Sequence, residues 1–590
     1  MHVPVRSSAK RSLLAFAAIL PLVVPATRLH AQFDPNDPPP QAGRLSATIG
    51  QVSIEPAGTD DWAQAYPNLP MGPGDRIYTD FNGRAEIQIG QNFLRIGPNT
   101  DITLTHVTPT RMDFAVGRGS VHVRAYGFWP GQMLYLQTPN GSVTLDQPSE
   151  VRVDALPDDD ATIYTPYSPG VFVASYPDIA LHPEPGQAVE FFGSNPVATQ
   201  WLAAAPFDPL DTWSHQRDGQ ITSAASFQYV SQEVPGAWEL DAAGQWTPGS
   251  PYGPVWFPNV QPGWAPYRYG RWVSRAPWGW IWVEDEPWGY APFHYGRWVQ
   301  WGGRWGWVPG PPASHPVWSP ALVVFAGGIH IGGGGVSVWF PLGPGEPFHP
   351  WYPASPVYIN QVNITNITPA PRVIVQNTYV TNVNVTNITY VNRTVGVTAV
   401  PAAAMTSGQS VAQVHVQVDA NIIAHAQVVA RPEVAPPAKP FVGPPPSRPV
   451  PAKVAATRPV VMNEKGQLIA ATPHAQPAQP PVKPAPQVKA PAGRAVVAPP
   501  PGVKAPNAKP AETAARSGAP AAAKPAAQPA KTPQPAAEAK PAAKPATEPA
   551  TGEEKPAAQA AKPGQPANKQ KPGDKNKPKP EEKKPEEKPK

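Results

Sequence analysis

The sequence predicts a mainly β protein that carries a long non-globular segment at its C-terminus. Short alternating runs of apolar and polar residues, broken by Gly, Pro, Asn and Asp, fill residues 43–193. Half of the twenty tryptophans lie between Trp264 and Gly310, where the words YGRWV and WGW each occur twice. The chain has 87 prolines, and Ala, Lys and Pro dominate its last third, a composition typical of segments without a packed core.

Residues 1–31 predict a secretory signal. Arg6, Lys10 and Arg11 precede an apolar run from Leu13 to Val24. Leu29-His30-Ala31 forms a cleavage site, so the mature protein would begin near Gln32. An uncleaved N-terminal anchor is the alternative, although the apolar run is short for a membrane span and is interrupted by proline. Under either interpretation the bulk of the chain is exported.

The charged residues divide the chain into an acidic body and a basic tail. Residues 32–430 carry 16 Lys and Arg against 30 Asp and Glu, and no lysine occurs between Lys10 and Lys439. From Arg431 onward the balance is 27 against 12. An acidic body repels phosphate, so we expect no nucleic-acid binding. The absence of cysteine excludes disulfides, thiolate metal sites and a Cys nucleophile.

Residues 43–193 are predicted to form an antiparallel β domain, because β-branched residues recur with period two between closely spaced turn residues. Residues 194–250 are predicted to be a connector of mixed character. Within it, DPLDTWSHQRDGQITSAASF (208–227) is the one short helix that we expect in the body.

Residues 251–350 are predicted to be a tryptophan-rich repeat of β-hairpins. The words from Ala265 to Val273 recur from Ala291 to Val299, about 26 residues later. Trp280 and Trp282 alternate along a strand, which puts both rings on one face. Each unit is expected to form a hairpin with a proline-marked turn and to stack on its copy.

The uncharged stretch from Ala321 to Gly343 is long enough to span a bilayer. Its glycines and its alternating Val and Ile disfavour a helix, so we expect two strands around a glycine turn and no transmembrane span after the signal peptide. Residues 351–430 are predicted to be a β segment in which Val, Ile, Thr and Asn alternate. Its N-x-T triplets are either glycan acceptors or, as we expect here, the polar face of long strands. They begin at Asn363, Asn366, Asn384, Asn387 and Asn392.

Residues 431–590 are predicted to be a disordered tail rich in Pro, Ala and Lys. Proline forbids a helix, and the segment has little apolar surface whose burial could offset the entropy of ordering. We therefore expect an extended chain with a bias toward polyproline II.

The words of the first β domain resemble the FecR domain. They run from GQVSIEP at Gly50 through DRIYTDFNGRAEIQIGQNFLRIGPNTDITL to Leu104, and FAVGRGSVHVRA and LQTPNGSVTL fit its later strands. From about Asp211 to Pro350, YGPVWFP, WAPYRYGRWV and WGYAPFHYGRWV are similar to DUF6600, an uncharacterised tryptophan-rich region that follows FecR domains in exported bacterial proteins. The resemblance implies a β fold and a location in the periplasm or at the cell surface.

The best-known FecR-type proteins relay a transporter's signal from a periplasmic domain, across one membrane helix, to a cytoplasmic anti-sigma segment. This chain departs from that design, because we expect neither a cytoplasmic N-terminal segment nor a later membrane span. A tryptophan block also stands in place of the C-terminal signalling domain. Sigma-factor regulation is therefore the alternative function rather than the expected one.

No catalytic constellation is present in the sequence. The clusters Asp158-Asp159-Asp160 and Glu284-Asp285-Glu286 are expected to be solvated loops rather than an acid/base pair or a calcium site. Neither a G-x-S-x-G motif nor a glycine-rich phosphate loop before a helix occurs. We therefore expect no enzyme, no cofactor and no metal. The histidines also argue against a metal site, because they do not have the spacing of metal ligands. They are His294, His315, His330 and His349.

The tryptophan block supplies the candidate ligand-binding residues. As a ladder for sugar rings, tryptophan offers an apolar face and an N–H donor, and arginine can stack or bind carboxylates. In the second interpretation the rings are the core of hairpins that lack Leu and Ile, with each arginine stacked between tryptophans. Strict repetition of words favours this second interpretation. The candidates are Arg271, Trp272, Trp280, Trp282, Arg297, Trp298, Trp305 and Trp307.

The sequence thus predicts a non-enzymatic, exported envelope protein. Its β domains would bind cell-wall glycan or an envelope protein, and its basic tail would tether it to anionic polymers. The alternative is a FecR-like periplasmic regulator of sigma-factor signalling, which needs a membrane anchor. A hydrolase built from scattered carboxylates is the third hypothesis and the least favoured.

Overall fold

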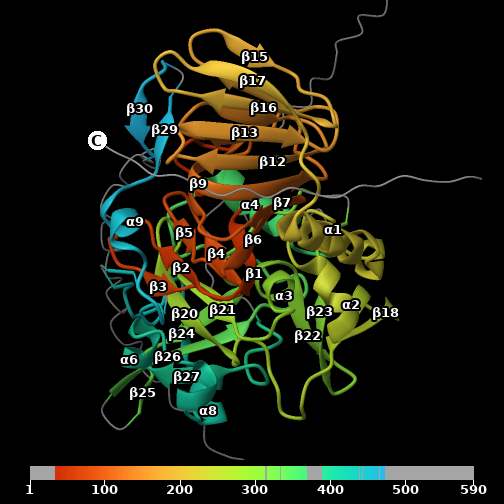
Figure 1. Cartoon of the computed structure of the whole chain (residues 1–590). Coiled ribbons are helices and arrows are strands. Elements are labelled where there is room, and N and C mark those ends of the chain that lie inside the picture. Colours follow the sequence, from red (N-terminus) through yellow and green to blue (C-terminus); the bar gives the residue numbers. More distant parts are fainter. Residues whose placement is uncertain are drawn as a thin grey trace, which may run out of the picture. The chain divides into compact units, whose positions relative to one another are not determined.

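The computed structural model describes most of the chain between Phe33 and Ala471. The predicted signal at 1–31 and the chain after Ala471 lie outside the described residues. Within them the fold is mainly β, as predicted, and the strand pairs are antiparallel with one exception (Figure 1). The structure describes residues 33–312, 315–331, 334–368, 389–437, 439–440, 443–463 and 465–471.

A sandwich of two sheets, which share the long strand β9 (Arg111–Ala125), forms the N-terminal part. β9 pairs with the first sheet through residues 119–125 and with the second through 111–118. Its pairing with β10 is the parallel exception. The first sheet has the order β4 (Leu69–Met71), β1 (Gly43–Ile49), β6 (Arg84–Ile89), β7 (Asn92–Ile96), β9, β12 (Ser149–Leu156), β13 (Ala161–Pro166), β16 (Gln187–Phe192) and β17 (Ala198–Ala203). The second has the order β3 (Ala63–Gln64), β2 (Val52–Glu55), β5 (Arg76–Thr79), β8 (Asp101–Val107), β9, β10 (Met133–Gln137), β11 (Ser142–Leu145), β14 (Phe172–Ser175) and β15 (Ile179–Leu181).

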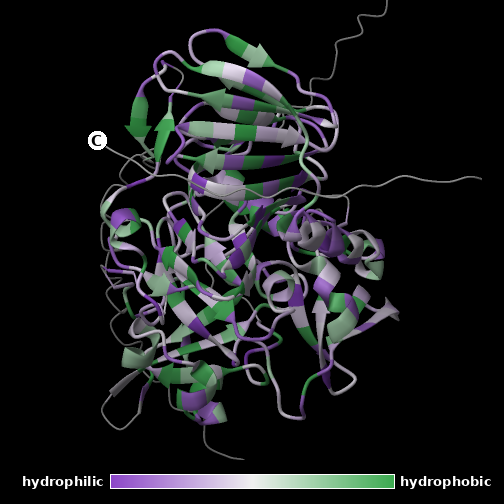
Figure 2. Cartoon of the chain, in the orientation of Figure 1, coloured by the Kyte–Doolittle hydropathy of each residue, from purple (hydrophilic) through white to green (hydrophobic). Residues whose placement is uncertain are grey.

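The two sheets hold together because alternate residues of each strand point between them. Figure 2 shows this alternation of hydrophobic and hydrophilic residues along the strands. The hydroxyl groups of Thr138, after β10, and Tyr164, on β13, are 2.8 Å apart and join the sheets. The strands continue to residue 203, past the predicted end at 193, because β17 adds to β16. One fully buried row of opposed residues crosses the first sheet at Leu45, Ile87, Leu94, Val123 and Val151.

Three β-hairpins, each with two tryptophans directly opposite each other, follow the sandwich. The two predicted hairpins are present, and β18–β19 is a third copy that sequence analysis did not identify. The first and third copies share a four-stranded sheet in the order β18-β19-β23-β22, whereas β20–β21 forms a separate two-stranded sheet. The predicted stack is therefore not one continuous sheet. The hairpins are β18 (Gly244–Ser250) with β19 (Gly253–Pro258), β20 (Gly270–Arg275) with β21 (Gly279–Glu284), and β22 (Arg297–Trp301) with β23 (Arg304–Val308).

The predicted strand pair between Ala321 and Gly343 is confirmed. β24 (Val323–Gly327) pairs with β26 (Gly334–Pro341), which also pairs with β25 (His330–Ile331). β27 (Thr398–Pro401) and β28 (Gln427–Val429) complete this sheet. Over the described ranges, every helix is too short or too polar for a membrane crossing. Helix α1 (Pro209–Thr222) confirms the helix predicted within 208–227, but it is not the one helix of the body. The other helices of the described residues are α2 (Leu240–Ala243), α3 (Tyr290–His294), α4 (Pro356–Ile364), α6 (Ala402–Thr406), α7 (Val411–Val414), α8 (Ala420–His425) and α9 (Ala452–Ala456), with 3-10 turns at Ala225–Gln228 and Ala237–Glu239.

The predicted β segment at 351–430 is wrong in part, because residues 356–364 form helix α4, and α6, α7 and α8 also lie in this segment. Ser355 caps the helix by accepting a hydrogen bond from the Tyr358 amide at 3.1 Å, and Pro356 occupies the first position. The apolar pattern also suits a helix, since Tyr358 and Val362 lie four residues apart and both are buried.

The asparagines of the described N-x-T triplets are buried rather than on a polar strand face. The side-chain amide of Asn363 donates to Phe348 O at 2.9 Å, that of Asn366 to Val317 O at 2.8 Å, and that of Asn392 to Trp298 O at 2.7 Å. Each amide thus satisfies a backbone carbonyl in the interior. The triplets at Asn384 and Asn387 lie outside the described residues.

The predicted boundary of the disordered tail at residue 431 is too early. β29 (Val460–Met462) and β30 (Leu468–Ala470) form a hairpin that joins the sandwich, where the Met462 amide donates to Thr138 O at 2.9 Å. In Figure 1, α9, β29 and β30 lie beside the sandwich strands. The short apolar runs VVM and LIA make this contact. The prediction missed them because it relied on the average composition of the tail.

The sandwich and the hairpin region share one hydrophobic core, so they are not independent domains. Two buried arginines cross between them. Arg44 on β1 pairs with Glu239 at 2.5 Å and donates to Asn68 Oδ1 at 2.7 Å. Arg275 on β20 pairs with Asp75, which precedes β5. Loss of one partner would leave a buried charge uncompensated.

We expect the chain truncated after Ala471 to keep the stability of the full-length protein, whereas truncation after Ala430 should cost about 3 kcal/mol. The shorter chain loses the Val454 and Thr457 carbonyls that bind the buried guanidinium of Arg76, both at 2.9 Å. It also loses Arg458, which pairs with buried Glu55 at 2.9 Å. Urea unfolding of both truncations measures the difference, and equal stability would show that residues 431–471 do not support the fold.

Candidate functional site

One tryptophan pair recurs in the three hairpins. The two rings stand directly opposite each other across the strands, and the first tryptophan of each pair follows the previous one after 26 residues. Trp256 also faces Trp307, which joins the first hairpin to the third. The pairs are Trp246 with Trp256, Trp272 with Trp282, and Trp298 with Trp307.

A glycine at the start of each hairpin makes room for the second ring. A Cβ atom on Gly270 would lie 2.7 Å from the Trp282 ring and 2.3 Å from Val283 O. Gly296 has a φ of +68° and meets the Trp307 ring in the same way. The glycine of the YGRW motif is therefore required for packing, because only glycine fits where the ring and the backbone approach so closely.

Every tryptophan predicted as a ligand ladder is buried. A ring at this depth offers no face to a sugar, so the structure favours the core interpretation. Trp272 contacts both Trp282 and Trp339 edge to face, with ring centroids 5.5 Å apart in each pair. The exposed fractions are 0% for Trp282 and Trp307, 1% for Trp272, Trp280 and Trp298, and 8% for Trp305.

The two arginines of the repeat bind different parts of the chain. Arg271 lies over the ring of Tyr66, 5.5 Å from its centroid, and pairs with Asp285 at 3.0 Å. Arg297 is buried and donates to Glu346 O at 2.9 Å and to Asn363 Oδ1 at 3.2 Å. These partners, rather than the predicted stack between tryptophans, decide where each guanidinium lies.

Glu284 is buried at the end of β21, contrary to the predicted solvated loop. Its Oε2 atom accepts a hydrogen bond from Trp282 Nε1 at 2.8 Å. Burial raises the pKa of Glu284 well above its usual range, and the neighbouring Asp285 adds to the effect. The predicted solvated turn at 158–160 is confirmed by the exposure of its three aspartates.

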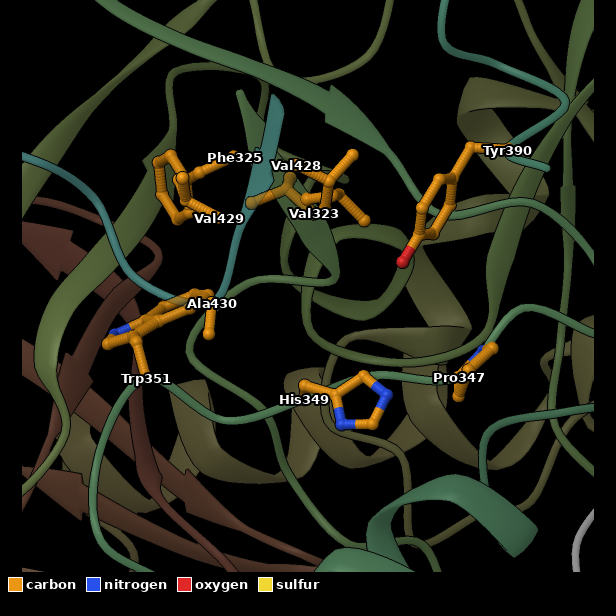
Figure 3. Close-up of a pocket in the computed structure, with 10 residues that line it drawn as sticks. Val323, Phe325, Pro347, His349, Trp351, Tyr390, Val428, Val429 and Ala430 are labelled. Atoms are coloured by element: carbon orange, nitrogen blue, oxygen red, sulfur yellow. The ribbon is translucent and has the colours of Figure 1, made fainter. Parts of the chain in front are cut away.

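The apolar pocket beside β24 is too small for an organic ligand. Its volume of about 20 Å³ holds one water molecule, whereas ligand pockets measure about 300–1,000 Å³. Figure 3 shows the His349 ring and the Tyr390 hydroxyl at its polar side and Phe325 at its apolar side. His349 Nε2 has no partner among the described residues, and a bound water would satisfy it. Burial lowers the pKa of His349.

A charged network lies between the outer face of the first sheet and helix α1. Glu86, Arg95, His122 and Arg152 stand directly opposite one another in a row across β6, β7, β9 and β12. Helix α1, which Figure 2 shows as largely hydrophilic, packs against β7 and β9. Ion pairs of the described residues connect Glu86, Glu150, Asp154, Asp208, Asp211, Asp218, Arg95, Arg124, Arg152, Arg217, His122 and His215.

The N-terminus of α1 is fixed to the sheet by its own cap. Asp208 accepts hydrogen bonds from the amides of Leu210 and Asp211, and Asp211 accepts one from the Asp208 amide in return. Asp211 also lies 3.0 Å from His122 Nδ1 and 2.8 Å from Arg152 Nη1. One side chain thus starts the helix and binds it to two strands.

His122 lies at the centre of the network and is fully buried. Its Nε2 atom is 2.9 Å from Glu150 Oε1, and His215 Nε2 is 2.9 Å from the same oxygen. Burial alone would lower the pKa of His122, but the hydrogen bonds to Asp211 and Glu150 raise it. Burial alone would raise the pKa of Glu150, but His122 and Arg124 lower it to about 2. Among the described residues, His122, Glu150 and His215 form the group that could hold a metal ion.

This network could not be predicted from the sequence because its members are far apart in the chain. The four histidines named from the sequence do not lie together; His294, for example, is buried with Nδ1 2.7 Å from Ser319 O. The available signal was the alternation in HVR at His122 and EVR at Glu150, which places charged residues on one strand face.

β17 is a free edge of the first sheet, since among the described strands it pairs with β16 alone. The Ala204 amide donates to Gly186 O at 3.1 Å. The backbone N–H and C=O groups of successive residues in a strand point to opposite sides. Since Ala204 faces β16, the backbone groups of Thr199, Trp201 and Ala203 point away from it. Trp201 stands opposite buried Val189, yet half of its side chain is exposed.

Residues 237–346 match the model of DUF6600, a family of unknown function, which supports the resemblance drawn from the tryptophan words and covers all three hairpins. No curated protein matches the chain. Two crystal structures of a "putative anti-sigma factor" from Parabacteroides distasonis are similar to part of it at 12% identity, with TM-scores of 0.20 and 0.21. The matches cover 22% and 24% of this chain and 59% and 65% of those chains.

We expect Trp280→Ala and Trp307→Ala to lower the free energy of unfolding by about 3–5 kcal/mol each, the cost of emptying a large buried aromatic site. Trp201→Ala, at an exposed position, is the matched control and should change it by less than about 1 kcal/mol. Denaturant unfolding measures all three. Stable Trp280 and Trp307 variants would contradict the core interpretation.

We expect Glu284→Gln to stabilise the protein increasingly as the pH rises above 4.5. A raised pKa means that Glu284 contributes its full stability below its unfolded value of about 4.5 and loses it as the pH rises through the folded value. The neutral amide avoids this loss, so the gain in stability over the parent should be larger at pH 8 than at pH 4.5. Unfolding at pH 4.5 and pH 8 measures the gain, and Glu286→Gln, outside the core, should show none.

Proposed function

We propose that the protein is a non-enzymatic, exported component of the bacterial cell envelope that binds a protein partner through the free edge of β17. The exposed Trp201 on an unpaired edge strand carries this proposal. An edge strand offers a row of free backbone donors and acceptors to which an extended segment of another protein can add. Trp201 supplies a ring that such a segment can cover.

The burial of the tryptophan block supports this choice of surface. The rings of the hairpins already contact one another, and β17 with its exposed Trp201 remains available to a partner. The chain after residue 471 carries 21 Lys and Arg against 10 Asp and Glu, which suits a tether to anionic envelope polymers.

Cell-wall glycan is a second candidate ligand for Trp201, because a sugar ring can stack on an exposed indole. Regulation of a sigma factor remains the alternative function, supported by the FecR-like words of the sandwich. Neighbouring genes for a sigma factor and an outer-membrane transporter would favour it.

Two substitutions separate a protein partner from a glycan. Thr199→Pro removes a backbone donor that faces away from β16 and keeps the Trp201 ring, so we expect it to abolish strand addition alone. Trp201→Ser removes the ring and should weaken either ligand. A photo-crosslinking residue at position 203, whose backbone groups also face away from β16, should capture one defined envelope protein in cells, and the same residue at exposed Asp159 is the control.

The two ligands give different results. Loss of the crosslinked product in both variants supports strand addition. Sedimentation with purified peptidoglycan that requires Trp201 but tolerates Thr199→Pro would favour glycan. A product that forms equally from positions 203 and 159, and that persists in both variants, would contradict the β17 surface.

A further inference from the structure

Two histidines from separate elements converge on one carboxylate oxygen in the network beneath α1. His122 comes from β9, Glu150 from β12 and His215 from α1, and both Nε2 atoms lie 2.9 Å from Glu150 Oε1. The three potential ligand atoms lie within 4.8 Å of one another. An ion about 2.1 Å from each atom fits this group after small rotations of the side chains.

The surroundings match those of a metal site. The Nδ1 atom of His122 lies 3.0 Å from Asp211 Oδ1, the carboxylate contact that orients a ligating imidazole. Arg124 holds the other oxygen of Glu150 at 2.7 Å, which leaves Oε1 as a single ligand atom. The ring of Tyr167 stacks on His122, and the ring of Phe207 lies against His215. His215 is 35% exposed, so the ion has a path from solvent.

The net negative charge of the network would also be balanced by a divalent cation. Its ion pairs connect six carboxylates with four arginines, which leaves two negative charges before the histidines are counted. One divalent ion on two neutral histidines balances them. Two protonated histidines would balance them as well, and the experiment below separates the two arrangements.

We infer that His122, His215 and Glu150 bind one divalent transition-metal ion of the zinc class, with Asp211 as the positioning residue. Two imidazole nitrogens and one carboxylate oxygen form a ligand set that Zn²⁺ favours over Mg²⁺ or Ca²⁺. The ion would clamp α1 onto two strands of the sandwich in a chain that has no disulfide.

The test uses the untagged full-length exported protein, stripped with EDTA and desalted. We expect it to bind one Zn²⁺ per chain, to unfold at a higher temperature with Zn²⁺ and to show no such shift with Mg²⁺. Co²⁺ should give the visible absorption of a four-coordinate site. His215→Gln keeps a donor for Glu150 but removes a ligand, so it should weaken Zn²⁺ binding by more than about 100-fold. His182→Gln, at an exposed histidine outside the network, is the matched control.

Metal-free His215→Gln should unfold at the temperature of the metal-free parent, which separates lost binding from lost folding. Binding of Zn²⁺ by His215→Gln with unchanged affinity would overturn the inference. So would a parent protein that retains no stoichiometric Zn²⁺, since the histidines would then serve only as charged hydrogen-bond partners.

Discussion

The cross-strand tryptophan pair seated on a glycine is the constraint on which the second half of the fold depends. These hairpins have few Leu or Ile residues, and an isolated hairpin is marginal in water. Each large ring buries about 150–250 Å², so one opposed pair supplies the apolar area that a hairpin otherwise lacks. The glycine is obligatory because the ring of Trp282 occupies the space of a Cβ on Gly270. Repetition every 26 residues therefore reflects packing, and the binding surface has to be sought elsewhere.

A core of indoles also decides which polar groups are buried with it. A buried indole N–H usually finds an acceptor; Trp307 donates to Tyr295 O at 2.7 Å and Trp282 donates to Glu284 Oε2 at 2.8 Å. Burial of Glu284 is thus a consequence of the ring beside it. The same core continues into the sandwich, where Arg44 and Arg275 bridge the two parts. The segment that matches DUF6600 is therefore part of a larger folded body.

Local sequence patterns predicted elements of secondary structure. Contacts between residues far apart in the sequence determine the features that those patterns did not predict. Alternation revealed the sandwich strands, and repeated words revealed two hairpins. The third hairpin escaped because Gly244-Gln245-Trp246 keeps the glycine and the ring but lacks the neighbouring Tyr and Arg. At α4, the valines and asparagines fit a strand as well as a helix, and the cap at Ser355 decides between them. His122 and His215 share no local spacing, so their meeting required the fold.

The distribution of arginine and lysine follows from the same physics. A buried guanidinium can satisfy several acceptors in one plane, as Arg76 does with Asp101 at 2.7 and 2.6 Å, whereas an ammonium is a strongly hydrated point charge. Arginine therefore serves the body, which contains no lysine between residues 32 and 430. Lys439 and Lys453 lie in the segment that packs on the sandwich, and both remain largely exposed. Lysine thus marks solvent exposure rather than the end of the folded body, which explains why composition alone placed that end too early.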